Sequence, residues 1–385
     1  MIALDRSLAP SLLLLILGGC ASSPPADGKP LATGLFETKT EKVPAAGDWY
    51  AADLNLDGKD ELLLTQPSGR TRVYSLDASA GLRQTATLPA AKWISVGDVT
   101  DDGRPDVLLG GASFQGYRAV DELSFSPLRA ESVPLAGEDS GHLSVTSFPI
   151  VGRFHRADQL EPIVVKDVYD LSALSPKPTQ VESFAAASGE VASTGNAELS
   201  VPLSLVKRFV AMDLDGDGLD ELWGMDFGGN LSQLRPAPSV EGPAWRVEQR
   251  WAVGDPTRLV LDDANGDGSP DLVGVGSALV VTGGREGSAG RLHDFELPSS
   301  ARGCVWIQLD DDAQRELACA GEGGDTPSAP AVYDADFERD VLTPRDMPEL
   351  SLEGQLLVGD FDGNGVDDLV AVDHELVISL GVPAP

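Results

Sequence analysis

Short apolar runs stand on either side of a recurring turn-like segment and predict the secondary structure of most of the chain. One such segment has Trp-Ile-Ser-Val before it at residues 93–96 and Val-Leu-Leu after it at residues 107–109. Apolar runs of this length that are bounded by turn residues are typical of β-strands and are too short for helices. The pattern therefore predicts an all-β chain of short strands joined by tight loops.

The segments between these strands form a nine-residue repeat. Five copies carry an oxygen-bearing side chain at positions 1, 3, 5 and 9 and a glycine at position 6. Two degenerate copies keep the frame and lose part of the pattern: loop 3 (residues 153–161) and loop 6 (308–316). In the same chain-order numbering, the five complete copies are loop 1 (53–61), loop 2 (98–106), loop 4 (213–221), loop 5 (263–271) and loop 7 (360–368).

Alternating oxygen atoms in a tight loop match the needs of Ca²⁺, which takes about six to eight oxygen ligands in flexible geometry. Glycine at position 6 permits the left-handed turn that brings the chain around the ion, so that the carbonyl of position 7 and the carboxylate of position 9 close the cage. The alternative is that Asp-Gly and Asn-Gly pairs only mark hairpin turns. Four ligand positions shared by five copies favour calcium, at up to five sites.

The predicted calcium donors follow directly from these positions. The side-chain ligands are Asp53, Asn55, Asp57 and Glu61 in loop 1, Asp98, Thr100, Asp102 and Asp106 in loop 2, Asp213, Asp215, Asp217 and Glu221 in loop 4, Asp263, Asn265, Asp267 and Asp271 in loop 5, and Asp360, Asp362, Asn364 and Asp368 in loop 7. The position-7 carbonyl donors are Lys59, Arg104, Leu219, Ser269 and Val366.

The loops begin 45 to 60 residues apart, close to the repeat of about 40–50 residues that four-stranded propeller blades have. Seven loops therefore predict an all-β, seven-bladed β-propeller with four-stranded blades over residues 34–382. After loop 7 only two strands remain, so the last blade lacks its outer strand. Residues 34–46 resemble residues 81–91, the predicted outer strand of the first blade. We therefore predict that the N-terminal strand at residues 34–43 closes the last blade and leaves no open sheet edge.

Cys304 and Cys319 lie almost symmetrically about the centre of loop 6. On the two strands that flank a hairpin they face each other, and in an oxidising compartment such a pair forms a disulfide. Two buried free thiols are the alternative. Trp49, Trp93 and Trp306 precede their loops by two to five residues, a recurrence that indicates packing between blades rather than platforms for sugar stacking.

At residues 358–370 the chain reads Val-Gly-Asp-Phe-Asp-Gly-Asn-Gly-Val-Asp-Asp-Leu-Val. This segment resembles FG-GAP/VCBS repeats, the units of integrin α-type propellers and of many bacterial surface proteins, and the resemblance covers nearly all of the predicted mature chain. It implies a propeller with structural calcium, bound by side chains at positions 1, 3, 5 and 9 and by the carbonyl of position 7.

Loops 3 and 6 depart from the family pattern. Thr100 replaces Asp or Asn at position 3 and implies a weaker second site. Extracellular calcium modules bind at about 10⁻⁴ to 10⁻³ M, and we expect affinities of that order.

Residues 1–19 have the features of a secretion signal, because Arg6 precedes an apolar run that is too short to span a bilayer. The end of this segment, Leu-Gly-Gly-Cys at residues 17–20, resembles a bacterial lipobox. The resemblance implies that Cys20 is lipidated and starts the mature chain. The alanine that follows the cysteine implies an outer-membrane lipoprotein of the bacterial cell envelope. Residues 20–33 are then a flexible tether. An ordinary cleaved signal with an incidental cysteine is the alternative.

Charge restricts the partners. The chain has 28 Lys and Arg against 61 Asp and Glu, a formal net charge of −33. Binding of nucleic-acid phosphates requires clustered cationic side chains, so nucleic acid is not an expected partner. Multivalent cations are the natural counter-charge for such a surface.

A fold does not identify a function. The sequence contains no His-Glu-x-x-His, no Gly-x-Ser-x-Gly and no phosphate-binding Gly-x-x-x-x-Gly-Lys-Ser/Thr motif, so we predict no catalytic residue. We expect a non-enzymatic, lipid-anchored binding or scaffold propeller whose ligand is a protein or a glycan. A polysaccharide-acting lyase or hydrolase on the same propeller and a purely structural envelope component are the alternatives. Residues 118–204 are either a binding insertion or a disordered excursion.

Overall fold

The computed structural model describes most of the chain after the predicted tether. Cys20 and the predicted signal at residues 1–19 lie outside the described residues. The described residues are 32–41, 47–66, 69–76, 81–121, 123–131, 143–187, 190–198, 206–226, 230–237, 244–252, 258–269, 271–275, 278–281, 291–297, 302–310, 312, 314–320, 331–345, 347, 354–372 and 375–383.

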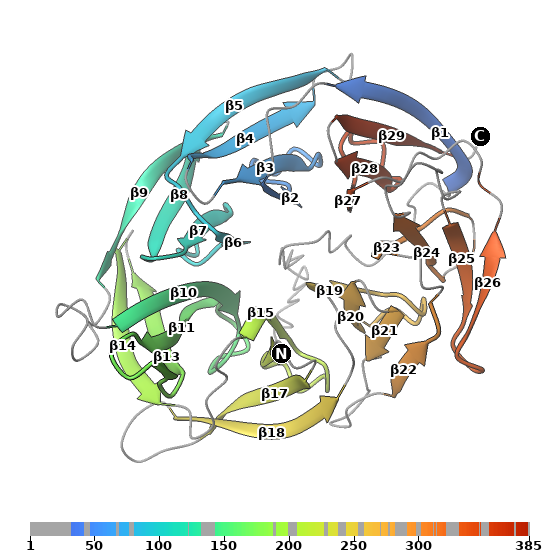
Figure 1. Cartoon of the computed structure of the whole chain (residues 1–385). Helices are drawn as coiled ribbons and strands as arrows, with labels where there is room; N and C mark the ends of the chain where they lie inside the picture. The colour runs from blue at the N-terminus through green and yellow to red at the C-terminus, as the bar shows by residue number, and fades with distance from the viewer. Residues whose placement is uncertain are drawn as a thin grey trace, which may run out of the picture.

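Within these residues the protein is all-β, and its strands form six sheets arranged as blades around a central axis (Figure 1). Five sheets have four strands each, and the sixth has nine. Two four-stranded sheets follow the chain directly from strand to strand: β2 (Asp48–Ala52), β3 (Glu61–Thr65), β4 (Thr71–Leu76) and β5 (Leu82–Leu88); and β15 (Val206–Met212), β16 (Glu221–Asp226), β17 (Asn230–Ala237) and β18 (Ala244–Ala252).

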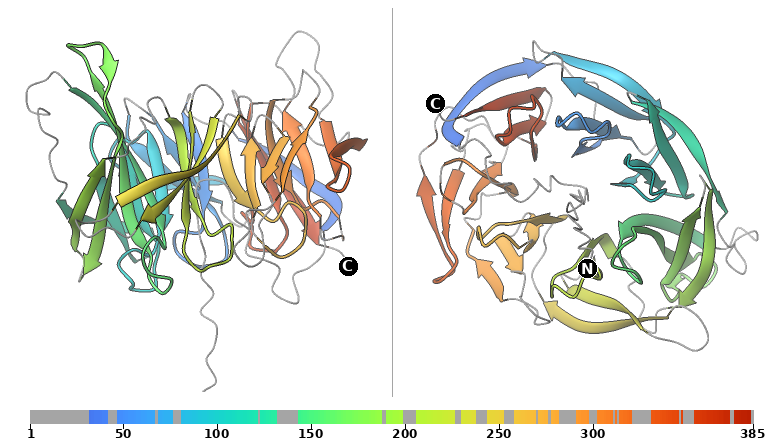
Figure 2. Two further views of the ribbon diagram at one scale, coloured as in Figure 1. Left: turned by 90° about the horizontal axis from the view of Figure 1, so that it is seen from below. Right: turned by 180° about the vertical axis from the view of Figure 1, so that it is seen from behind.

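Two further four-stranded sheets repeat this order in the C-terminal half of the ring: β19 (Arg258–Asp262), β20 (Asp271–Val275), β21 (Ala278–Val281) and β22 (Leu292–Phe295); and β23 (Arg302–Ile307), β24 (Glu316–Ala320), β25 (Ala331–Asp336) and β26 (Val341–Arg345). Figure 2 shows the same ring turned on its side and from behind, with the sheets standing around the axis.

Burial explains why the sequence shows these strands as short apolar runs. In β3, β7 (Asp106–Gly110), β24 and β28 (Asp368–Val372), the second strands of their blades, every residue is buried. A strand that neighbouring blades cover on both faces has no side that faces solvent, so apolar residues do not alternate with polar ones along it. The outermost strands β5 and β26 are exposed or half-buried at every position except Leu88 and include polar residues.

The prediction of seven blades is wrong, because the structure has six. The strands around loops 2 and 3, assigned to two blades by their spacing, belong to one sheet of nine strands. Its members are β6 (Trp93–Gly97), β7, β8 (Gln115–Asp121), β9 (Ser124–Glu131), β10 (Leu143–Gly152), β11 (Glu161–Asp170), β12 (Ser175–Pro176), β13 (Gln180–Ala187) and β14 (Glu190–Glu198).

The outer strands β9 and β14 join this sheet by running parallel to each other, with Glu190, Val191 and Ala192 opposite residues 129–131. The spacing of loops counts the inner strands and carries no information about pairing between outer edges, which is why the sequence overcounted the blades. The nine-stranded sheet also takes in most of residues 118–204: the described part of that stretch is largely strand and belongs to the propeller wall.

The predicted closure of the ring by the N-terminal strand is confirmed. β1 (Ala32–Glu41) pairs antiparallel with β29 (Leu376–Pro383), and Thr38 lies opposite Ser379. The sheet order is β1, β29, β28 and β27 (Gln355–Gly359), so the first strand of the chain is the outer strand of the last blade (Figure 1). Pairing the two ends of the chain gives the last blade its fourth strand, as every other four-stranded blade has.

The core lies between blades, where the tryptophans predicted to pack there are found. Trp49 is buried and shares a cluster with Leu357 and Val370 of the last blade. The Trp93 ring on β6 lies 4.2 Å from that of Phe148 on β10, a contact between the two ends of the nine-stranded sheet. These contacts cross from one set of strands to the next, so the apolar side chains hold the blades against one another.

A disulfide joins Cys304 on β23 to Cys319 on β24, as predicted. A register shift between Arg302 and Val305 accompanies it, and both cysteines are buried. A bridge that closes a loop of this length contributes about 3 kcal/mol in the chain-entropy model. In the described part of the chain, no helix has the length and apolar character needed to cross a membrane.

Candidate metal-binding loops

Each repeat connects the first and second strands of a blade-like unit, and the five complete copies share one backbone conformation. The position-6 glycine lies in the left-handed region in all of them, with φ between 82° and 87°. The position-1 carboxylate holds the turn: Asp53 accepts hydrogen bonds from the backbone N–H groups of Asp57 and Gly58, at 3.2 and 3.0 Å. Asp360 makes the same contacts in loop 7. Local hydrogen bonds therefore set the curvature of the loop.

A second contact ties the two ends of the loop together. The position-2 N–H donates to the position-9 carboxylate, as from Leu54 to Glu61 at 2.9 Å and from Phe361 to Asp368 at 2.7 Å. The same bond occurs in loops 2, 4, 5 and 6. The position-2 side chains are buried and apolar in all seven loops: Leu54, Val99, Phe154, Leu214, Ala264, Leu309 and Phe361. The sequence analysis overlooked position 2, although an apolar residue recurs there.

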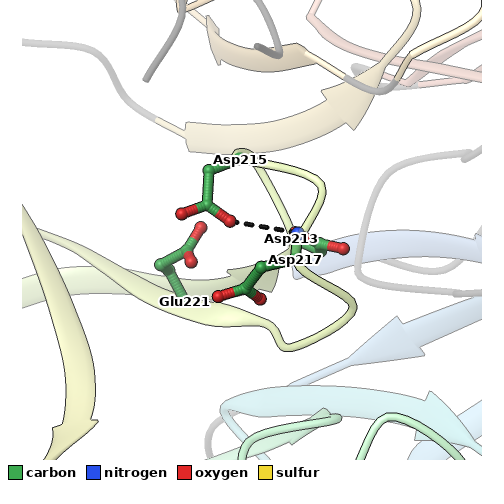
Figure 3. A group of neighbouring side chains, drawn as sticks. All are labelled: Asp213, Asp215, Asp217 and Glu221. Carbon is green, nitrogen blue, oxygen red and sulfur yellow. Dashed lines mark hydrogen bonds between the residues drawn. The ribbon is translucent and has the colours of Figure 1, made fainter. Parts of the chain in front are cut away.

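The structure brings the predicted ligands together in loops 4 and 7. Carboxylate oxygens of Asp213, Asp215, Asp217 and Glu221 lie within 4.8 Å of one another, and their side chains point toward a common centre (Figure 3). Asp360, Asp362 and Asp368 form the same kind of group, and so do Asp310, Asp312 and Glu316 in degenerate loop 6. Among the described residues, the carboxylates of loops 1, 2 and 5 form no such group. The binding of calcium by the position-7 carbonyl groups stays a prediction.

Loop 2 contains two polar atoms whose hydrogen-bonding needs are unmet. Asp106 at position 9 is fully buried, and its Oδ1 has no hydrogen-bond partner. The Oγ1 of Thr100 at position 3 is likewise buried without a well-aligned hydrogen bond, although its side chain lies close enough to the Asp106 carboxyl to lower the pKa of that group. A buried, unsatisfied carboxylate oxygen costs free energy, and a cation bound by the loop would satisfy it. The residues present therefore fit a hard, oxygen-seeking ion such as Ca²⁺.

Burial also raises the pKa of the position-9 carboxyl groups. The pKa of Glu61 rises to about 8 and that of Asp368 to about 8, because both are desolvated and face other carboxylates. Burial raises the pKa of Asp106 to about 7. A nearby positive charge favours the ionised form, but burial outweighs it where an arginine is present: the pKa of Glu221 beside Arg235 is still raised to about 8, and that of Glu316 beside Arg345 to about 7.

Position 8 carries contacts between successive loops that the sequence analysis overlooked. Asp60 of loop 1 accepts a hydrogen bond from the backbone N–H of Asp360 at 3.0 Å, and its own N–H donates to the carbonyl of Asp360 at 2.9 Å. Asp220 of loop 4 makes the same two bonds to the backbone of Arg153 in loop 3. In loop 7, Asp367 accepts a hydrogen bond from the N–H of Gln308 in loop 6. In loops 1, 4 and 7 these carboxylates link the loop to position 1 of the loop before it.

A groove of about 920 Å³ opens beside loop 1. Its lining combines apolar side chains with both signs of charge: Leu54, Leu56, Leu76, Ala119, Leu123, Lys59, Arg83, Arg104, Asp57, Asp60, Glu61 and Asp121 are among its residues. Leu56 at position 4 of loop 1 is 50 % exposed and has φ of 60°. A leucine rarely adopts this left-handed conformation, so the loop holds an apolar side chain outward against local preference.

Comparison with known proteins adds little beyond the fold. No family model and no curated protein sequence matches the chain. Among solved structures, the chain is similar to BBS1N in its complex with ARL6DN from a mercury-soaked crystal, at 12 % identity and a TM-score of 0.49, over 89 % of this chain and 97 % of that one. It is also similar to the WD40 β-propeller domain of Doa1, at 12 % identity and a TM-score of 0.43, over 89 % and 97 %. Likeness at this level carries no argument about function.

The raised carboxyl pKa values predict an inverse pH dependence of stability in the presence of a chelator. Glu61 titrates ordinarily at 4.5 and in the folded protein at about 8, so between these values the folded state binds more protons than the unfolded state. The stabilisation is complete below about pH 4.5 and is lost as the pH rises toward 8. We expect the free energy of unfolding in EDTA, measured by urea denaturation, to fall from pH 5 to pH 8.

Glu61→Gln removes one of these titrating groups and should make the decline with pH shallower. The exposed Glu338 provides the matched control, because Glu338→Gln should leave the profile unchanged. A stability that rises from pH 5 to pH 8 in the original chain, or equal slopes for Glu61→Gln and the original chain, would contradict the assignment.

Proposed function

We propose that this chain is a calcium-stabilised propeller of the FG-GAP/VCBS type, anchored to the bacterial outer membrane by a lipid at Cys20, and that it binds a protein partner in the groove beside loop 1. The observation that carries the binding function is the groove itself, where loop 1 presents an apolar side chain in a left-handed conformation. Position 4 has a positive φ in all five complete loops, and among them only loop 1 has a large apolar side chain there, half exposed at the groove where a partner can contact it.

Three features support calcium in the loops. The carboxylates of loop 7 converge, Asp106 has an unsatisfied buried oxygen, and burial raises the pKa of Glu61 and Asp368. A divalent cation relieves each of these unfavourable features, because it neutralises the carboxylates and takes up their free oxygens. The role of the ion in this proposal is structural: the side chains at positions 1, 3, 5 and 9 hold it, and it holds the loop.

Calcium should stabilise the protein, and Glu61→Gln should separate this effect from carboxylate repulsion. At a calcium concentration 100 times Kd, one site contributes about 2.7 kcal/mol to the free energy of unfolding. We expect calcium to raise the melting temperature of the original chain at pH 8 and EDTA to lower it again. Glu61→Gln should be more stable than the original chain in EDTA and gain less from calcium. Equal melting temperatures of the original chain in EDTA and in calcium would refute structural calcium.

The lipid anchor rests on the sequence alone, on Leu-Gly-Gly-Cys at residues 17–20 after an apolar run. When the full chain is expressed in a bacterium with an outer membrane, we expect it to partition into the detergent phase and to incorporate labelled palmitate. Cys20→Ala should abolish the labelling and leave an uncleaved or soluble chain. Palmitate incorporation that persists in Cys20→Ala would rule out this anchor.

A protein partner suits the lining of the groove better than a glycan does. Leu56 and Leu76 line the groove together with Arg83 and Arg104, and arginine is enriched at protein interfaces. The described lining contains no tryptophan, tyrosine or phenylalanine on which a sugar ring would stack. A protein segment that combines apolar and charged side chains is therefore the proposed ligand class.

Two matched leucines test the groove. Leu56 and Leu174 are both exposed leucines at positive φ, but Leu174 lies in the turn between β11 and β12, away from the groove. Asparagine tolerates positive φ, so Leu56→Asn and Leu174→Asn should both fold with unchanged melting temperature. We expect an envelope-extract partner, identified by cross-linking and mass spectrometry, to be lost with Leu56→Asn and kept with Leu174→Asn.

The reverse pattern would move the binding site to the β11–β12 turn and overturn the groove proposal. Binding to an array of purified glycans that is lost with Leu56→Asn, without a protein partner, would assign the groove to a glycan instead.

A further inference from the structure

In loops 3, 4 and 6, a positively charged or protonatable side chain contacts the position-9 carboxylate. In loop 3, the Nδ1 of His155 at position 3 lies 2.7 Å from the Oε2 of Glu161 at position 9. In loop 6, Arg345 reaches Glu316, and in loop 4, Arg235 reaches Glu221. Loops 3 and 6 are the two that lost the metal pattern, whereas loop 4 has the full set of calcium ligands.

Arg345 shows how a guanidinium replaces an ion in loop 6. Its Nη1 lies 2.9 Å from Asp310 Oδ2 and 3.1 Å from Glu316 Oε1, which are positions 3 and 9. The same nitrogen lies 3.1 Å from Asp334 Oδ1 on β25. One cationic nitrogen thus contacts three carboxylates, which is the arrangement that a bound cation would make. An arginine supplies the charge together with fixed hydrogen-bond donors.

Arg235 occupies loop 4 in the same manner. Its Nη2 lies 2.5 Å from Glu221 Oε1 and pairs also with Asp215 Oδ2, and its Nη1 lies 3.4 Å from Asp217 Oδ2. The guanidinium therefore contacts positions 3, 5 and 9, three of the four predicted calcium ligands in the cluster of Figure 3. Glu221 is buried, and the Arg235 side chain is only 22 % exposed. An ion and this guanidinium compete for the same oxygens.

The two arginines reach their loops from different strands. Leu222 on β16 pairs with Leu234 on β17, which places Arg235 across the strand pair from Glu221. Arg345 comes instead from β26, the outer strand, and reaches past β25 to loop 6. The position-9 carboxylates of loops 4 and 6 are thus paired with arginines that come from different strands. This indicates that the charge of the position-9 carboxylate has to be balanced in each blade.

Loops 1, 2 and 7 differ. Among the described residues, no cationic side chain forms an ion pair with Glu61, Asp106 or Asp368. In loop 2, Arg118 lies opposite Asp106 in the β7–β8 register and pairs with Asp102 at position 5, at 2.8 Å, while Asp106 Oδ1 has no hydrogen-bond partner. Around the ring, loop 7, loop 1 and loop 2 are consecutive, since β1 and β29 join the end of the chain to its beginning.

We propose that Arg235 is the resident cation of loop 4 and excludes calcium from it, as Arg345 does in loop 6. Calcium then acts on the arc of the ring formed by loops 7, 1 and 2, which contains the closure of the chain and the groove. This assignment rests on the proposed calcium function for loops 1, 2 and 7, whereas the role of Arg235 in loop 4 is tested separately.

The experiment counts bound calcium by equilibrium dialysis of the purified mature chain at calcium concentrations up to about 1 mM, the upper end of the range for extracellular modules. Asp213→Asn replaces the position-1 carboxylate of loop 4 with a neutral amide, a weaker calcium ligand, and should leave the number of bound ions unchanged. Asp360→Asn makes the same change in loop 7 and should reduce the number bound in this concentration range by one. Arg235→Gln should increase it by one, and the double variant Asp213→Asn with Arg235→Gln should lose this gain.

Melting temperatures give the second readout. Arg235→Gln should melt at a lower temperature than the original chain in EDTA, because it leaves Glu221 and Asp215 unpaired, and calcium should restore the loss. Arg339→Gln is the matched control: its side chain is 79 % exposed and pairs only with Asp336, so neither the ion count nor the melting temperature should change. If Arg235→Gln does not fold without calcium, the Asp213→Asn comparison in the original background still tests the proposal.

A loss of one bound ion in Asp213→Asn overturns the proposal, because calcium then occupies loop 4 beside Arg235. An unchanged ion count in Arg235→Gln overturns it as well. If the original chain binds no calcium, the proposed calcium function fails; a gained ion in Arg235→Gln would still support the role of Arg235, and the absence of a gain would refute both.

Discussion

A carboxylate is buried at the start of the second strand in nearly every repeat of this protein, and the rest of the architecture accommodates it. Glu61, Asp106 and Asp368 are almost completely inaccessible to solvent, and a buried carboxylate is stable only when it is hydrogen bonded and its charge is balanced. The first requirement is met within the loop, where the position-2 N–H donates to it. That bond fixes the two ends of the loop and directs an apolar side chain into the space between blades.

The second requirement, charge balance, is met differently around the ring. Arg235 and Arg345 bring a guanidinium to the position-9 carboxylate in loops 4 and 6, whereas loops 1, 2 and 7 present their carboxylates without such a partner in the described residues. A similar solution appears away from the loops, where the buried Glu182 on β13 pairs with Lys166 on β11 at 2.7 Å. Metal sites and ion pairs are therefore alternative answers to one electrostatic problem in the same fold.

Closure of the ring depends on contacts between residues at opposite ends of the chain. β1 supplies the outer strand of the last blade, and Asp60 bonds to the backbone of Asp360, 300 residues away. This closure, the seam of the ring, thus combines the pairing of β1 with β29 on the outside with the hydrogen bonds between loops 1 and 7 on the inside. The groove opens on the other side of loop 1, so this loop lies between the seam and the proposed binding surface.

Local patterns in the sequence determined much of this. Oxygen-bearing residues at alternate positions and a glycine at position 6 specify the loop, because its hydrogen bonds join residues no more than seven apart. The apolar runs specify the strands, and the similarity of residues 34–46 to residues 81–91 was enough to predict the closing strand. The disulfide was predictable for the same reason, since Cys304 and Cys319 flank a single hairpin.

Only the tertiary structure decided how the repeats relate to one another. The parallel pairing of β9 with β14 merges two predicted blades into one sheet, and no repeat length contains that information, because it depends on where two outer edges meet. Arg235 looks like any strand residue in the sequence, and only the register of β16 and β17 brings it to Glu221. The loop is local and was readable from the sequence, whereas the partner of its buried charge comes from another strand and had to be seen in three dimensions.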